Sequence, residues 1–180
     1  ETIENEKERK HMQRLYEISQ LKEIEKPLPL SFSHASLIAQ LFESEEAIIS
    51  SLKRSSCYDE KVKEEIMKRI KLARNWARKY APEHMRYSLL EDINRVKGKL
   101  DEKQKTFLTK LAEWLEEKPR TREEIHNQIY ILARELDIQP KKAFQAIYLI
   151  MLGKLAGPKA GTLLASLDRK LVIDRLRCKR

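Results

Sequence analysis

Apolar side chains recur at steps of three and four residues along most of this chain, and no segment of convincing length alternates apolar with polar residues. Steps of three and four place side chains on one face of an α-helix, whereas strict alternation marks a half-buried β-strand. Only 4 glycines and 6 prolines interrupt the 180 residues. The pattern therefore predicts an all-α fold.

Polar caps and prolines divide the first half of the chain into helices. A helix over residues 4–24 is expected to carry one narrow apolar stripe, made of Met12, Leu15, Ile18 and Leu21. Pro27 ends it, because a proline disfavours helical geometry in the residue before it. The next helices are expected to begin at polar N-caps, namely Ser33 or Ser36, Ser44 and Asp59. Pro82 closes the last and longest of them.

Two capping boxes open helices in the second half. Asp101 with Gln104, and Thr121 with Glu124, can each satisfy two backbone amides at a helix start. The later signals are a proline in a first turn, a glycine stop and an aspartate cap, at Pro140, Gly153 and Asp168. The helix expected between Pro140 and Gly153 is apolar on several faces, so we predict that it lies at the centre of the fold.

The lobe boundary is expected near Gly98, after a weakly helical stretch over residues 88–96. We therefore predict a two-lobed helical bundle, with an N-terminal lobe over residues 1–100 and a C-terminal lobe over residues 101–180. The chain opens with Glu rather than Met, in mid-helix pattern, which suggests a piece of a longer protein.

Composition excludes several classes of protein. No apolar run is long enough to span a bilayer, and the mixed charges of the first ten residues form neither a secretory signal nor a transit peptide. A cytosolic location is expected. Cys57 and Cys178 lie far apart without a CxxC pattern, so they are expected to be ordinary thiols.

The positive charge is concentrated in two stretches of the chain. The net charge of +9 arises from +7 over residues 61–100 and +8 over residues 141–180, while the other segments are close to neutral or acidic. Such blocks favour a polyanionic partner. Soluble lysine-rich helices would give the same counts, so either block alone is ambiguous.

No constellation of residues supports catalysis or metal binding. The histidines at 34, 84 and 126 are scattered and flank no Asp or Ser constellation that would support catalysis. Glu123 with His126 lacks the second copy that a di-metal bundle needs. Trp76 and Trp114 could stack on bases, but they fall within helical apolar patterns and are interpreted as core residues.

Two segments carry a resemblance to a known family. Residues 73–83, read as ARNWARKYAPE, and residues 151–167, read as MLGKLAGPKAGTLLASL and followed by VIDRL, resemble class I lysyl-tRNA synthetases. The segments lie in the family's order, and the resemblance extends from about His34 onward. It identifies the C-terminal anticodon-binding region, an all-helical cage similar to that of glutamyl-tRNA synthetases.

The resemblance also implies what the chain does. The parent enzyme would join lysine to tRNA(Lys) with ATP and Mg²⁺, whereas this chain lacks HIGH-type and KMSKS-type motifs and would not itself activate lysine. The expected partners are tRNA(Lys) and the catalytic domain of the same parent chain, with no cofactor, membrane or DNA partner.

The predicted tRNA-binding residues are cations of the two basic stretches: Arg69, Arg74, Arg78, Lys154, Lys159, Arg169, Lys170 and Arg175. Lys159 follows Gly157-Pro158, where free amides at a helix start could accept a phosphate. Close helix packing would explain the same glycines, Gly157 and Gly161. Two alternatives stay open: a nucleic-acid-binding helical module without sequence preference, and a structural helical adaptor.

Overall fold

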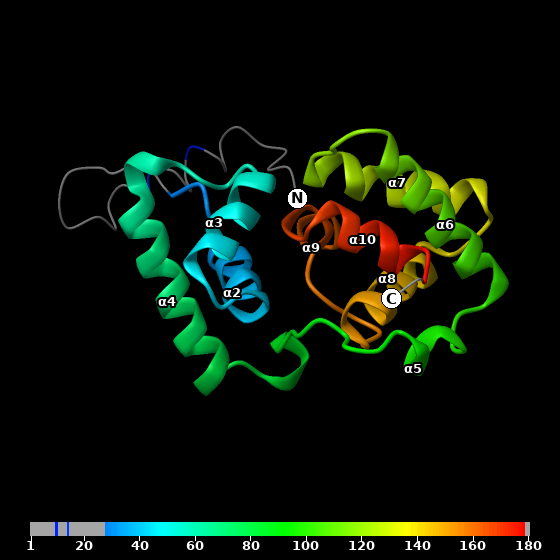
Figure 1. The fold of residues 1–180 in the computed structure, drawn as a ribbon, viewed down its shortest axis with the longest axis horizontal. Coiled ribbons are helices and arrows are strands. Elements are labelled where there is room, and N and C mark those ends of the chain that lie inside the picture. The colour runs from blue at the N-terminus through cyan, green and yellow to red at the C-terminus, as the bar shows by residue number, and fades with distance from the viewer. Residues whose placement is uncertain (1–9, 11–13, 15–27, 179–180) are drawn as a thin grey trace.

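The computed structural model describes residues 10, 14 and 28–178, and within these ranges every regular element is a helix. The all-α prediction is confirmed (Figure 1). The predicted helix over residues 4–24 falls outside the described residues, apart from residues 10 and 14. The helices in chain order are α2 (Phe32–Leu41), α3 (Glu45–Arg54), α4 (Lys63–Lys79), α5 (Asn94–Lys97), α6 (Glu102–Glu117), α7 (Arg122–Glu135), α8 (Pro140–Leu152), α9 (Ala160–Ser166) and α10 (Arg169–Leu176).

The helices pack into two groups, each around its own apolar core. Helices α2, α3 and α4 lie on one side and α6 to α10 on the other (Figure 1). Ile38 of α2 belongs to the first core, whereas Leu37 belongs to the second. Helix α2 therefore contributes to both cores. No helix among the described residues is long and apolar enough to cross a membrane.

The N-terminal boundaries differ in part from the sequence prediction. Ser44 caps α3 as predicted, but α2 begins after Ser31, whose hydroxyl accepts from the amide of His34, so the choice of Ser33 or Ser36 was wrong. Asp59 opens a 3₁₀ turn over Glu60–Val62 before α4, because its carboxylate accepts from the amide two residues on.

The connection between the two groups packs on the second core. Residues 88–93 are not regularly helical, and only α5 forms in the predicted stretch, because the amide of Leu90 donates to the carbonyl of Met151 at the end of α8. Val96 and Leu100 are buried in the second core. The division into lobes at residue 100 stays a prediction.

The C-terminal helices follow the sequence signals closely. Both capping boxes form, Pro140 occupies the first turn of α8, and Gly153 ends that helix with φ 68°. Helix α8 packs against α5, α6, α7, α9 and α10, which confirms its central place. Gly161 allows α9 to approach α7, since a Cβ there would overlap the carbonyl of Arg122. The packing interpretation of this glycine is thus supported.

A buried polar seam joins the two groups of helices at Ser166, the last residue of α9. Its carbonyl accepts from the Ser51 hydroxyl at 2.7 Å and from Arg54 Nη2 at 3.0 Å. Its own hydroxyl is 2.9 Å from Nε2 of His34. Burial, together with the charge of Arg122, lowers the pKa of His34 to about 4, so the imidazole is neutral near pH 7.

Candidate nucleic-acid interface

Three of the predicted tRNA-binding arginines hold the carboxyl ends of helices. Arg74 donates to the carbonyls of Ala39 and Phe42 at 3.1 and 2.8 Å, at the end of α2. Arg169 does the same for α6, through Leu115 and Glu116 at 2.8 and 2.6 Å. The last carbonyls of a helix have no partner within the helix and carry partial negative charge. The guanidinium groups of Arg74 and Arg169 supply these carbonyls with both hydrogen-bond donors and positive charge.

Arg175 performs this task inside the second core. Its Nη1 lies 3.4 Å from the carbonyls of Ile150 and Met151 near the end of α8, and the residue is buried. Burial lowers the pKa of its guanidinium from the usual value. The buried Nε has no hydrogen-bond partner among the described residues. Arg175 therefore does not face solvent as a phosphate ligand would.

Two further predicted cations bind backbone carbonyls near the surface. Arg69 donates to Leu30 at 2.6 Å. Lys154 donates to Glu83 and Arg86 at 3.0 and 2.8 Å, and it lies 3.7 Å from the Glu83 carboxylate. Because Lys154 belongs to the second basic stretch and Arg86 to the first, this contact brings the two stretches together.

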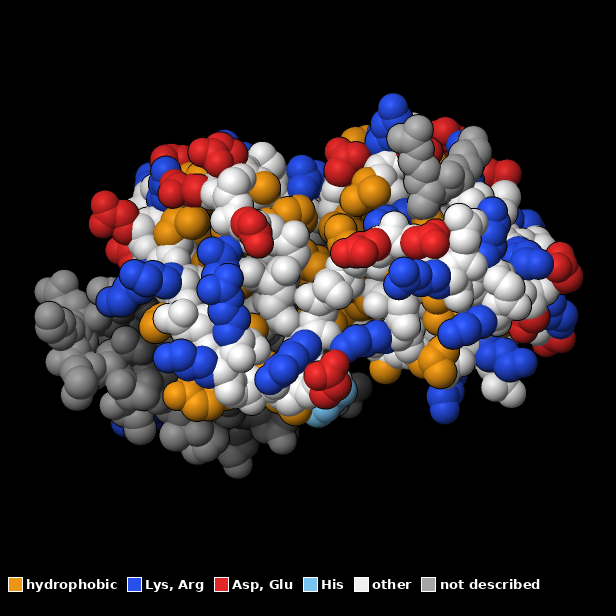
Figure 2. Space-filling model, turned by 60° about the horizontal axis from the view of Figure 1, so that its bottom comes forward, with side chains coloured by type: hydrophobic (Ala, Val, Ile, Leu, Met, Phe, Trp, Pro, Cys, Tyr) orange, Lys and Arg blue, Asp and Glu red, His pale blue; other side chains and the backbone are white. Residues whose placement is uncertain are grey.

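The other three predicted cations are available to a ligand. Arg78, Lys159 and Lys170 are exposed and have no hydrogen-bond or ion-pair partner among the described residues. Figure 2 shows Lys and Arg side chains spread across both groups of helices on one face, with several acidic side chains between them. The charge is therefore shared across the two groups, although it is not uniform.

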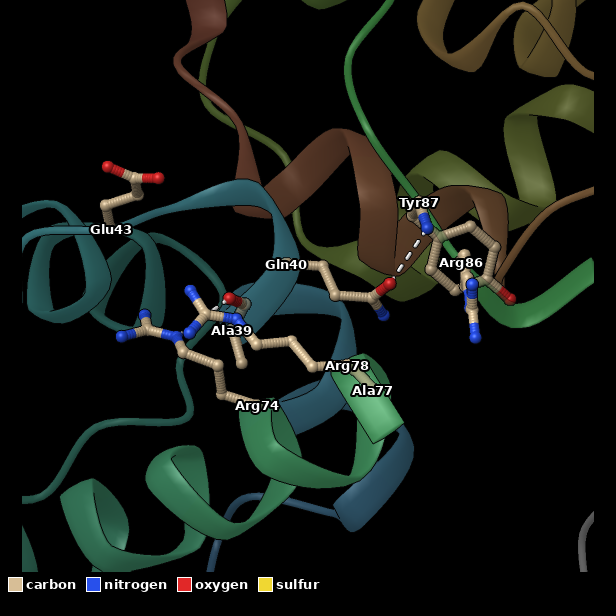
Figure 3. A pocket seen from close by; sticks show the side chains of 8 residues that line it. All are labelled: Ala39, Gln40, Glu43, Arg74, Ala77, Arg78, Arg86 and Tyr87. Atoms are coloured by element: carbon tan, nitrogen blue, oxygen red, sulfur yellow. Dashed lines mark hydrogen bonds between the residues drawn. The ribbon is translucent and has the colours of Figure 1, made fainter. Parts of the chain in front are cut away.

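An arginine-lined pocket lies between α2, α4 and the segment that follows α4. Its volume is about 270 Å³ (Figure 3), and its lining residues are Ala39, Gln40, Glu43, Arg74, Ala77, Arg78, Arg86 and Tyr87. In Figure 3, Arg74 and Arg78 extend from α4 toward the end of α2, while Arg86 and Tyr87 lie at the opposite end. The lining contains three guanidinium groups and one carboxylate, so the pocket favours an anion such as a phosphate.

Hydrogen bonds fix the far side of this pocket. Gln40 Oε1 accepts from the amide of Tyr87 at 2.9 Å, and its Nε2 donates to the carbonyl of Ser36 at 3.0 Å. Arg86 Nε donates to the carbonyl of Ala81 at 3.0 Å. Gln40 thus joins α2 to the connection on this side of the pocket. Burial raises the pKa of Tyr87, so its phenol stays protonated.

Sequence reasoning found Arg74 and Arg78 of this pocket but missed Gln40, Arg86 and Tyr87. Arg86 lies in the +7 stretch and could have been proposed on charge alone. Nothing in the local pattern singles out Gln40 or Tyr87, because their roles arise from a contact 47 residues apart.

The tryptophans occupy two different environments. Trp114 packs against the second core, as predicted, with the guanidinium of Arg120 4.1 Å from its ring centroid. Trp76 is half-buried and meets the exposed ring of Phe32 edge-on at 5.5 Å. Among the described residues, no group of three or more His, Cys, Asp or Glu side chains could hold a metal ion.

Comparison with known proteins identifies a family and several relatives of this chain. Residues 64–179 match the family described as anticodon binding domain. The lysine–tRNA ligase of Methanocaldococcus jannaschii is 36% identical over 174 residues, which cover 90% of this chain and 33% of the relative. Those of Thermococcus kodakarensis and Picrophilus torridus are 35% and 31% identical, covering 98% and 89% of this chain and 35% and 31% of the relatives. The chain thus spans about a third of the length of these relatives.

Proposed function

The chain belongs to the anticodon binding domain family, and on that premise we propose that it binds the anticodon end of tRNA(Lys) within a lysine–tRNA ligase. The observation that carries the proposal is the extent of the matches, since lysine–tRNA ligases align with up to 98% of this chain. The basic pocket and the exposed cations supply the physical means.

The eight predicted cations would act in two ways. Arg78, Lys159 and Lys170 would contact phosphates directly, because their charges are exposed and unpaired among the described residues. The other five donate to backbone carbonyls, and they would shape the surface that meets the RNA. Arg74 combines both roles, since it caps α2 and also lines the pocket.

The whole parent protein would attach lysine to its tRNA. In this proposal ATP and Mg²⁺ act at a catalytic domain elsewhere in the parent chain, and the present chain selects and positions the tRNA. The parent would work in the cytoplasm. The N-terminal lobe, residues 1–100, would contact the tRNA stem, and the C-terminal lobe, residues 101–180, would contact the anticodon loop.

A competition experiment tests the anticodon preference. Labelled tRNA(Lys) is bound to the 180-residue chain on filters and displaced by unlabelled tRNA(Lys), or by the same tRNA with its three anticodon bases replaced. We expect the unaltered tRNA to compete at least about tenfold better, which corresponds to ~1.4 kcal/mol. The competitors differ only in the anticodon bases, so contacts with the rest of the tRNA are the same in both and cannot cause a difference in competition.

Two results would contradict the proposal. Equal competition by the altered tRNA and by duplex DNA would identify a nucleic-acid-binding module without sequence preference. No binding of any tRNA at low salt, where phosphate contacts are strongest, would favour a structural adaptor.

A further inference from the structure

Four aromatic rings form a row across α7 and α8, outside the arginine-lined pocket. His126 and Tyr130 of α7 meet edge-on with ring centroids 5.3 Å apart, and Tyr130 meets Phe144 of α8 in the same way, also at 5.3 Å. His126 and Phe144 are 5.8 Å apart. Phe144 and Tyr148 are nearly parallel at 6.4 Å. Residues four apart on a helix share a face, so both helices present these rings to each other.

One side of the row is open to solvent. Tyr130 is 44% exposed, and its hydroxyl has no hydrogen-bond partner among the described residues. His126, Phe144 and Tyr148 are half-buried. Tyr130 is therefore the ring of the row that is most accessible to a ligand.

The inner end of the row is fixed in place. The hydroxyl of Tyr148 donates to the carbonyl of Pro158 at 2.6 Å, and its ring lies against Gly157, where a Cβ would come within 2.7 Å of Cδ1. Burial and the neighbouring phenols of Tyr87 and Tyr130 raise the pKa of Tyr148 to about 12. Tyr148 is therefore the fixed, half-buried end of the row.

Cations stand at both ends of the row. Arg134 follows Tyr130 by one turn of α7, and Lys141 precedes Phe144 by one turn of α8. Lys159 follows Pro158, the acceptor of the Tyr148 hydroxyl. All three are exposed and have no hydrogen-bond or ion-pair partner among the described residues. The carboxylate of Glu123, one turn before His126, is paired with Arg122 at 2.5 Å.

We propose that the row His126–Tyr130–Phe144–Tyr148 is a stacking platform for unpaired bases of an RNA loop, with Arg134, Lys141 and Lys159 holding the adjoining phosphates. This inference rests on the proposed function and names the surface at which the RNA loop would bind. Flat rings accept the faces of unstacked bases, and cations beside them neutralise the backbone. A duplex keeps its bases stacked on one another, so the platform selects a loop.

The test uses a hairpin RNA that carries the fluorescent base 2-aminopurine in its anticodon loop, and the 180-residue chain with three variants. Tyr130→Ala is expected to weaken binding of the loop roughly tenfold, and to abolish the fluorescence change that stacking causes. Tyr130→Phe keeps the ring and is expected to bind like the unaltered chain. Ile131→Ala is the matched control, because Ile131 is 48% exposed on the same helix.

The salt dependence separates stacking from charge. Tyr130→Ala removes no cation, so the slope of log affinity against log salt concentration should not change. Lys141→Ala should make this slope shallower by the contribution of about one phosphate contact. Melting temperatures of both variants are measured alongside, and Tyr130 is exposed enough to be replaced without unfolding the chain.

The outcomes separate this inference from the proposed function. If the unaltered chain binds the loop and Tyr130→Ala binds it equally well, the platform is overturned and the function stands. Equal weakening for the loop and for a blunt duplex of the same sequence would also overturn the platform. If the unaltered chain binds neither RNA, both proposals fail.

Discussion

The cations at the helix ends and the cations on the outer surface come from the same basic stretches but do different work. Arg74, Arg169 and Arg175 face carbonyls that end α2, α6 and α8. Arg78, Lys159 and Lys170 face solvent. Formal charge therefore overstates how much positive potential an RNA would meet. The first set fixes the relative placement of helices, although Arg74 also lines the pocket, whereas the second set has no partner among the described residues and is free to bind phosphates.

This contrast is strongest at Arg175. A buried cation is stable only where hydrogen-bond acceptors surround it. Arg175 has two carbonyl acceptors, both at 3.4 Å, and its Nε has no partner among the described residues, so its hydrogen bonding is weak for a buried cation. Burial lowers the pKa of this guanidinium, but arginine side chains stay protonated in proteins. We infer that the end of α8 depends on it.

Replacing Arg175 should have the largest effect on stability. Arg175→Ala leaves a cavity in the second core and removes a donor from the carbonyls of Ile150 and Met151, of which Met151 keeps the amide of Leu90, so we expect the free energy of unfolding to fall by about 4 kcal/mol. Urea denaturation followed by circular dichroism measures this. Arg169→Ala, at a more exposed helix end, is the comparison and should cost only about 1 kcal/mol. Equal losses in the two variants would contradict the distinction between buried and surface caps.

Acidification creates a new buried cation without carbonyl acceptors. His34 is 5% exposed, its Nδ1 has no partner among the described residues, and Arg122 opposes its protonation. Its pKa is lower folded (about 4) than unfolded (6.5), so the unfolded chain binds more protons between these values. The free energy of unfolding should be unaffected by this group above pH 6.5, and fall by about 3 kcal/mol as the pH drops to 4.

His34→Gln isolates this contribution from that of the carboxylates. The glutamine does not titrate, so the difference in unfolding free energy between the two proteins should shrink or reverse below pH 6. Chemical denaturation at a series of pH values measures the difference. Parallel pH profiles for the two chains would show that the seam tolerates a charge at position 34.

Local signals were sufficient to predict most of the fold. The capping boxes at Asp101 and Thr121 and the stop at Gly153 act within a few residues, so the sequence displays them directly. The stretch over 88–96 was predicted less well, because Leu90 bonds to a residue 61 positions away. Its backbone partner is a tertiary contact, which helical propensity does not reveal.

The candidate interface was harder to predict than the fold. Charge counts located the basic stretches, but they could not tell Arg78 from Arg74, since both lie on α4 and only one meets the end of α2. Tyr130 was missed because an exposed aromatic has no distinctive spacing, and its neighbour Phe144 lies on another helix. The sequence does not show which side chains of different helices point toward one another.

The smallest effect on stability is expected at the outer surface, and it should coincide with a clear loss of RNA binding. A triple variant with Arg78, Lys159 and Lys170 all changed to Ala removes three charges that have no partner among the described residues. Its free energy of unfolding should stay within about 0.5 kcal/mol of the unaltered chain. The slope of log affinity for tRNA(Lys) against log salt should become shallower by about 2 to 3, because each phosphate contact contributes about 0.7 to 0.9.

A matched triple variant shows whether position or charge alone matters. Lys53, Lys61 and Lys68 are exposed cations of the N-terminal group outside the pocket, and Lys53 lies over the ring of Tyr58. Changing all three to Ala removes the same net charge, yet it should leave the salt slope almost unaltered. If both triple variants reduce the slope equally, the RNA responds to total charge, and the surface cations at 78, 159 and 170 have no special place. If only the first variant reduces the slope, the positions of Arg78, Lys159 and Lys170 matter, and not only the total charge.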